Sequence, residues 1–90
     1  MKTSGLMFNI SYANSVKKDI KDIPSNTLLK IKNEIENLKY FPNINNIKKL
    51  NSHPLADFRL RVGNYRVLFD VESEKKEIYI LKISHRKDIY

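Results

Sequence analysis

Hydrophobic and polar positions follow two successive patterns along the first part of the chain. From Met7 to Tyr12 they alternate, which predicts a short strand with one buried face. Two segments with an apolar residue every three or four positions follow, and this spacing predicts two amphipathic helices separated by Pro24. The apolar stripes are Tyr12, Val16, Ile20 and Ile23 in the first helix and Leu28, Ile31, Ile35 and Leu38 in the second. We therefore expect a helical hairpin that buries one face of each helix.

The second half of the chain begins with a loop and continues as a hairpin. Asn43 to Pro54 is polar and rich in asparagine, so it is predicted to be a connecting loop. The strand-like runs Phe58 to Val62 and Tyr65 to Val71 flank Gly63-Asn64, which is typical of a two-residue hairpin turn.

A third strand completes the predicted sheet. The run Ile78 to Ile83 is apolar on both faces apart from Lys82, which predicts a central strand. The predicted class is therefore α+β: an N-terminal strand, a helical hairpin and a three-stranded antiparallel meander in one mostly antiparallel sheet. Residues 7–90 are expected to form a single domain, and residues 1–6 a disordered leader.

Composition excludes several classes of protein. The chain has 90 residues and no cysteine, so disulfides, thiolate metal ligands and a cysteine nucleophile are ruled out. The histidines, His53 and His85, are isolated and lack metal-ligand spacing, so we expect no metal and no cofactor. No apolar run approaches the roughly 20 residues of a membrane helix. We expect a cytoplasmic protein without a membrane partner.

The basic residues suggest a phosphate-rich partner. The formal net charge is +7, with 17 basic and 10 acidic residues. All the arginines lie in the last third of the chain, and their planar guanidinium groups suit forked contacts to phosphate. They are Arg59, Arg61, Arg66 and Arg86.

The predicted turn fixes which residues of the hairpin face each other. If Gly63-Asn64 is the turn, Arg61 lies opposite Arg66, and alternation places Arg59 on the same face. Directly opposed arginines repel by about 0.2–1 kcal/mol, so a bound anion or a nearby carboxylate should offset them. Asp57 and Asp70 are the carboxylates with the right parity, and both explanations remain open. The side chains expected in the core rather than as base-stacking platforms are Tyr65, Phe69 and Tyr79.

Two motifs resemble the RelE/ParE superfamily of toxins from toxin–antitoxin pairs. They are Phe-Arg-Leu-Arg-Val-Gly-Asn-Tyr-Arg-Val-Leu-Phe at 58–69 and His-Arg-Lys-Asp-Ile-Tyr at 85–90. The resemblance implies a helical hairpin on one side of the sheet and a basic concave surface on the other. It assigns catalytic roles to Arg59, Arg66, Arg86 and Tyr90. Further expected contacts to phosphate or RNA are Arg61, Lys49, Lys82 and Lys87.

The RelE-like branch implies a metal-free endoribonuclease that enters the ribosomal A site and cuts messenger RNA. A second basic position expected two residues before Arg59 is Asp57 here, which would weaken the local field or act as a base. Asp57 and His85 are therefore additional catalytic candidates, and His85 is otherwise a structural residue. The alternatives are a ParE-like inhibitor of DNA gyrase and a non-catalytic basic interaction domain. The implied partners are an acidic RelB-like antitoxin, messenger RNA and the ribosome. The free toxin is expected to be a monomer and to form a higher-order complex with the antitoxin.

Overall fold

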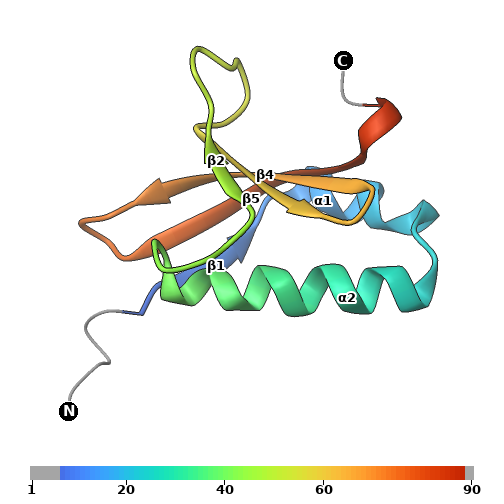
Figure 1. Ribbon diagram of the computed structural model, residues 1–90, viewed down its shortest axis with the longest axis horizontal. Helices are drawn as coiled ribbons and strands as arrows, with labels where there is room; N and C mark the ends of the chain where they lie inside the picture. The colour runs from blue at the N-terminus through green and yellow to red at the C-terminus, as the bar shows by residue number, and fades with distance from the viewer. Residues whose placement is uncertain (1–6, 89–90) are drawn as a thin grey trace.

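Five strands in the described range form one sheet (Figure 1). The computed structural model describes residues 7–88. The strands are β1 (Asn9–Tyr12), β2 (Ile47–Lys49), β3 (Phe58–Val62), β4 (Tyr65–Glu72) and β5 (Glu77–His85). Their order is β1-β5-β4-β3-β2, with β1 parallel to β5 and all other neighbours antiparallel. The predicted α+β class and mostly antiparallel sheet are confirmed.

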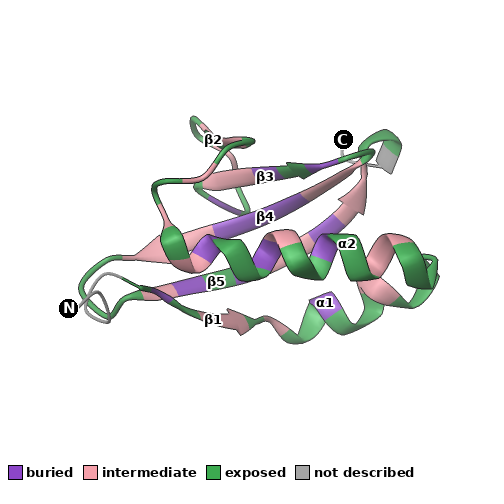
Figure 2. Ribbon diagram, turned by 60° about the horizontal axis from the view of Figure 1, so that its bottom comes forward, coloured by how far each residue is buried: buried purple, intermediate pink, exposed green. Residues whose placement is uncertain are grey.

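Helix α2 (Ser25–Glu36) covers one face of the sheet and continues into the short helix η3 (Asn37–Tyr40) (Figure 2). Its side chains Ile31 and Ile35 are fully buried, as is Leu38 in η3. These three residues belong to the predicted apolar stripe, so the sequence pattern identified the packed face correctly.

Helix α1 (Asn14–Asp19) continues into η2 (Ile20–Asp22) and lies along β5 beyond the end of β1. The hydroxyl of Ser15 donates a hydrogen bond to the carbonyl of Leu81, and the carboxylate of Asp19 accepts one from the amide of Ile83. Side chains of α1 thus satisfy backbone groups of β5 that lack a neighbouring strand there. Tyr12 belongs to β1 rather than to this helix, since it pairs with Ile80.

The hydrophobic core lies between the sheet and α2. Aromatic rings occupy one end of it, with Phe41 edge-on to the rings of Phe8, Phe58 and Phe69 at centroid distances of 5.2–6.3 Å. The sheet contributes fully buried side chains from its three longest strands, namely Leu60, Val67, Phe69, Ile78 and Ile80.

Two predictions about the sheet were wrong. The segment predicted as a loop contains β2, which pairs with β3 and makes the sheet five-stranded. Tyr79, expected in the core, is 36% exposed, because it alternates with the buried Ile78 and Ile80 on β5 and faces away from α2. The predicted leader, residues 1–6, and the predicted catalytic Tyr90 lie outside the described residues.

Candidate nucleic-acid interface

The hairpin of β3 and β4 places three arginines on the face of the sheet away from α2. Its observed register pairs Arg61 with Arg66 and Arg59 with Leu68, as the two-residue turn predicted. Gly63 begins that turn with φ of 57°, a conformation that glycine adopts without steric cost. The residues that alternate with the arginines are buried under α2, so the arginines project from the opposite face.

Two further basic residues extend this group. Lys48 of β2 lies opposite Arg59 in the register and therefore shares its face. Arg86 begins the short helix η4 (Arg86–Asp88), and its amide donates a 2.6 Å hydrogen bond to the carbonyl of Asn64 in the turn. Figure 1 shows η4 and the loop between β2 and β3 rising on the side of the sheet away from α2. We call Lys48, Arg59, Arg61, Arg66 and Arg86 the arginine surface.

The guanidinium groups differ in how they are held. Arg66 donates hydrogen bonds from Nη1 to the carbonyls of Gly63 and Tyr65, at 3.4 and 3.2 Å, which keeps its side chain near the turn. Nε of Arg59 is buried and has no hydrogen-bond partner within the described part of the chain. A buried donor without an acceptor costs about 1–3 kcal/mol, so Arg59 gains from any anion that lets the side chain reorient.

The two carboxylates considered as internal partners, Asp57 and Asp70, form no ion pair with Arg59 or Arg61. Oδ1 of Asp70 accepts a 2.7 Å hydrogen bond from the amide of Asp57. Among the side chains that the structure describes, those of residues 7–87, no carboxylate lies within 4.0 Å of a nitrogen of Arg59 or Arg61. The geometry therefore favours a bound anion over a salt-bridged face for these two residues.

Three other sequence-predicted site residues, His85, Lys82 and Lys87, have surroundings different from those of the arginines. His85 packs edge-on against Tyr65 with ring centroids 5.1 Å apart, on the helix side of the sheet, and its Nδ1 accepts a hydrogen bond from the amide of Lys87. Lys82 forms an ion pair with Asp19 of α1 at 3.5 Å. An open hollow of about 470 Å³ is lined by a group that includes Asp19, Tyr65, Lys82, His85 and Lys87. His85 thus lies on the other face of the sheet from Arg59, Arg61 and Arg66. Lys82 lies opposite Leu68 in the register and shares the face of Arg59, but its ammonium is paired with Asp19 of α1.

Strand β2 also distinguishes two neighbouring lysines. Lys49, a predicted RNA contact, lies opposite Phe58 and so belongs to the helix side of the sheet, whereas Lys48 belongs to the arginine surface. Sequence reasoning missed Lys48 because it predicted no strand there. Once β2 is recognised, alternation alone identifies the correct lysine.

Neither a metal centre nor a membrane span emerges from the described residues. Among the described side chains, residues 7–87, no three His, Cys, Asp or Glu residues are grouped closely enough to hold a metal ion. No helix in the same range is long and apolar enough to cross a membrane.

Comparisons with known proteins agree on one group of relatives. The family model described as "ParE toxin of type II toxin-antitoxin system, parDE" matches residues 10–90. A Methanocaldococcus jannaschii relative named RelE1 is 36% identical over 88 residues, covering 94% of this chain and 97% of the relative. Toxin RelE3 of the same organism is 32% identical over 85 residues, covering 90% and 93%. The archaeal RelE–RelB complex of Pyrococcus horikoshii OT3 aligns with a TM-score of 0.76 and 26% identity, over 91% of this chain and 98% of that one.

Proposed function

This chain belongs to the RelE/ParE superfamily of toxins from type II toxin–antitoxin systems, and from this premise we propose that it is an endoribonuclease. It cleaves messenger RNA on the ribosome and so blocks translation. The observation that carries the proposal is the opposed pair Arg61 and Arg66, beside Arg59, on a face where Arg59 and Arg61 have no carboxylate partner among the described side chains of residues 7–87. The names of the RelE relatives support the same function.

The arginine surface suits the chemistry of RNA cleavage without a metal. A base takes the proton of the ribose 2′-hydroxyl, the 2′-oxygen attacks the adjacent phosphorus, and the bond to the leaving 5′-oxygen breaks. The 5′-oxygen takes up a proton from the protonated base or from water, so a 2′,3′-cyclic phosphate and a 5′-hydroxyl result. Negative charge accumulates on the phosphorane between these steps. Arg59, Arg61 and Arg66 are placed to hold the phosphate and stabilise that charge, and Arg86 borders the same end of the hairpin.

The base that removes the 2′-proton must come from another residue type, since arginine remains protonated. Tyr90 is the candidate from the sequence, and it lies outside the described residues. The exposed carboxylate of Asp57 is the second candidate, because it directly precedes β3 and lies two residues from Arg59. His85 is the weakest of the three, because it packs on the helix side against Tyr65.

The proposed partners follow from the same premise. The P. horikoshii relative was solved as a RelE–RelB complex, and we infer that this toxin is likewise neutralised by an antitoxin. An acidic antitoxin complements a chain of net charge +7. We further infer that the toxin acts in the cytoplasm, where messenger RNA is translated, and that it is a monomer when free.

The test is induction of the toxin in cells followed by mapping of RNA 5′ ends. Cuts within translated codons are expected for the wild type and are expected to disappear in Arg59→Ala and in Tyr90→Phe. Lys30→Ala is the matched control, because Lys30 is an exposed basic residue on α2, away from the arginine surface. Asp57→Asn distinguishes Asp57 from Tyr90 as the base.

The alternative function is a ParE-like inhibitor of DNA gyrase, which the description of the matching family model favours. The same induction experiment separates the two functions. Intact messages together with gyrase arrest and DNA damage would replace the nuclease by the gyrase inhibitor. Intact messages without either effect would leave a non-catalytic interaction domain.

A further inference from the structure

The face of the sheet that carries the arginines is organised in rows of side chains that run across the strands. Residues paired in the register share a row, and consecutive rows lie about 7 Å apart, because every second residue of a strand points to the same face. Counted from the Gly63 turn, the first two rows contain basic residues and no acidic one. The first row comprises Arg61, Arg66 and Ser84, and the second comprises Lys48, Arg59, Leu68 and Lys82.

The next two rows have the opposite charge. The third row comprises Asp70, Tyr79 and Ser11, and the fourth comprises Glu72, Glu77 and Asn9. Glu72 lies directly opposite Glu77, just as Arg61 lies opposite Arg66 at the other end of the same face. Because like charges in such pairs destabilise a sheet, neither pair is explained by folding alone. We call Asp70, Glu72 and Glu77 the acidic end.

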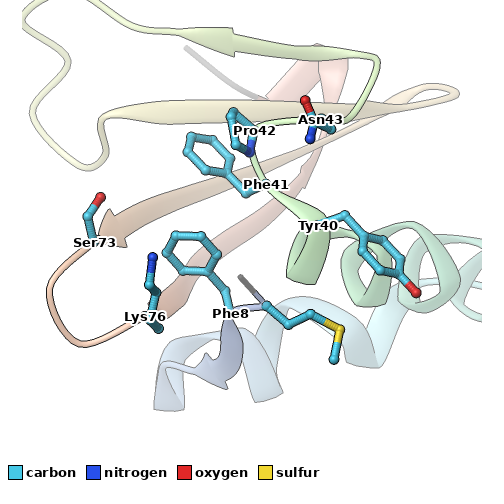
Figure 3. A pocket seen from close by; sticks show the side chains of 8 residues that line it. Phe8, Tyr40, Phe41, Pro42, Asn43, Ser73 and Lys76 are labelled. Atoms are coloured by element: carbon cyan, nitrogen blue, oxygen red, sulfur yellow. The ribbon is translucent and has the colours of Figure 1, made fainter. Parts of the chain in front are cut away.

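The charges of Glu72 and Glu77 are not neutralised by their neighbours. The hydroxyl of Ser11 donates a 3.0 Å hydrogen bond to Oε1 of Glu77, which leaves the negative charge in place. The ammonium of Lys76, in the adjacent turn, lies 5.3 Å from the centre of the ring of Phe8, a core residue, beside an apolar hollow (Figure 3). Among the described side chains of residues 7–87, no Lys or Arg nitrogen lies within 4.0 Å of either carboxylate.

Distance determines which parts of a bound RNA these carboxylates affect. Glu72 follows Leu68, in the second row, by four residues, which corresponds to roughly 13 Å along the strand. The Debye length at physiological ionic strength is about 8 Å, so the acidic end hardly weakens the attraction of Arg61 or Arg66 for a phosphate. A phosphate that follows the strands beyond Asp70 comes within that length of Glu72 and Glu77 and is repelled.

We propose that RNA crosses the sheet along the two basic rows, roughly perpendicular to β3 and β4, and that Glu72 and Glu77 exclude it from the other half of the face. The inference rests on the proposed nuclease function and names the residues that limit the segment of RNA held by the toxin itself. From β2 to β5 the basic rows extend over three strand spacings, roughly 14 Å. A surface of this size, closed on one side by like charge, contacts only a short segment of RNA.

The experiment compares the wild type with Glu72→Gln/Glu77→Gln by fluorescence anisotropy. The double variant removes both charges and retains an amide oxygen that can accept the bond from Ser11. The probes are 2′-O-methyl RNAs, which lack the attacking 2′-hydroxyl, of about three and about twelve nucleotides. The double variant should bind the long probe about fivefold more tightly and the short probe with unchanged affinity.

The matched control is Glu34→Gln/Glu36→Gln, which changes the net charge equally on α2, the helix that covers the opposite face. It should change neither affinity by more than about twofold. Amide chemical shifts locate the RNA. With the long probe, the amides of Asn9 and Glu77 should be unaffected in the wild type and should shift in the double variant at the acidic end.

Unchanged affinities in Glu72→Gln/Glu77→Gln overturn the exclusion and leave the nuclease intact. Equal gains in the control also overturn it, since net charge alone is then sufficient, as does tighter binding without shifts at Asn9 and Glu77. If the wild type binds neither probe, the exclusion is wrong, and the nuclease still stands or falls with the induction experiment. Binding that Arg61→Ala does not weaken contradicts the arginine surface, and with it both the exclusion and the proposed function.

Discussion

The backbone amide of Asp57 donates a 2.7 Å hydrogen bond to a carboxylate oxygen of Asp70. The two residues lie one step beyond the last pair of the β3–β4 ladder, Phe58 with Phe69. The carbonyl of Asp57 also accepts a hydrogen bond from the amide of Leu50, so both backbone groups of Asp57 are held. Asp70 therefore anchors the loop between β2 and β3 next to Arg59, rather than neutralising an arginine.

Replacement of Asp70 tests this anchoring. Asp70→Ala removes the acceptor and should lower the free energy of unfolding by about 1–2 kcal/mol. Asp70→Asn retains an amide oxygen that can accept the same bond, so it should cost less than half as much. Urea denaturation gives both values, and hydrogen exchange at the Asp57 amide reports the bond directly. Equal losses in the two variants would mean that the charge of Asp70 matters, not its role as acceptor.

Replacement of Arg61 should separate stability from activity. Arg61 is exposed, faces Arg66 and has no carboxylate partner among the described side chains of residues 7–87, so Arg61→Ala relieves repulsion in the free protein. The free energy of unfolding should stay the same or rise by about 0.2–1 kcal/mol. Cleavage of ribosome-bound messenger RNA should fall about 100-fold, since a stabilising charge on the phosphorane is lost. A variant that loses stability and activity together would argue that Arg61 has a structural role.

Gly63 is the residue whose backbone sets the register of the arginines. Its φ is 57°, and an added Cβ would meet no atom within 4 Å, so Gly63→Ala should be penalised by backbone strain alone. We expect a loss of about 1–2 kcal/mol in the free energy of unfolding. Gly63→Asn should lose less, because asparagine tolerates positive φ better. Thermal denaturation of the three proteins under one buffer condition checks the order, and a smaller loss for alanine than for asparagine would contradict it.

The ionisation of Tyr12 should lower the stability of the fold at alkaline pH. Burial, and secondarily the negative charge of Glu36, raise the pKa of Tyr12 above its usual value of 10.0. A raised folded-state pKa means that the stabilisation is complete below the unfolded-state pKa and is lost as pH rises through the folded-state value. Tyr12→Phe should therefore reduce the decline in stability above about pH 10. In a pH titration followed by tyrosinate absorbance, Tyr12→Phe should lack the transition that the wild type shows at the highest pH. In Glu36→Gln, that transition should occur at a lower pH than in the wild type.

Local patterns predicted those parts of the fold that local interactions determine. The Gly63-Asn64 turn sets the pairing of β3 with β4 because a two-residue turn leaves one register, and alternation from that register alone places Arg59, Arg61 and Arg66 together. The stripe through Ile31 and Ile35 likewise identified the buried face of α2.

The elements that the sequence did not reveal depend on distant partners. β2 has three residues, too few for a periodic signal, and it exists because its backbone pairs with β3. The acceptor role of Asp70 depends on an amide 13 positions earlier in the chain, which no local spacing could indicate. Tyr79 was predicted to be a core residue because its run is apolar, but within the described residues no helix covers the face of β5 that carries Tyr79.

Lys48 and Lys49 provide the sharpest test of the arginine surface, because they are adjacent, exposed and chemically identical. The register places Lys48 opposite Arg59 and Lys49 opposite Phe58, on the two faces of the sheet. Lys48→Ala should weaken binding to single-stranded RNA and reduce the slope of log affinity against log salt by about 0.7, the value for one lost phosphate contact. Lys49→Ala removes the same charge from the chain and should leave the slope nearly unchanged. The measurement is fluorescence anisotropy with a labelled RNA oligonucleotide at several salt concentrations. Equal slopes for the two variants would mean that net charge, rather than the face of the sheet, determines RNA binding.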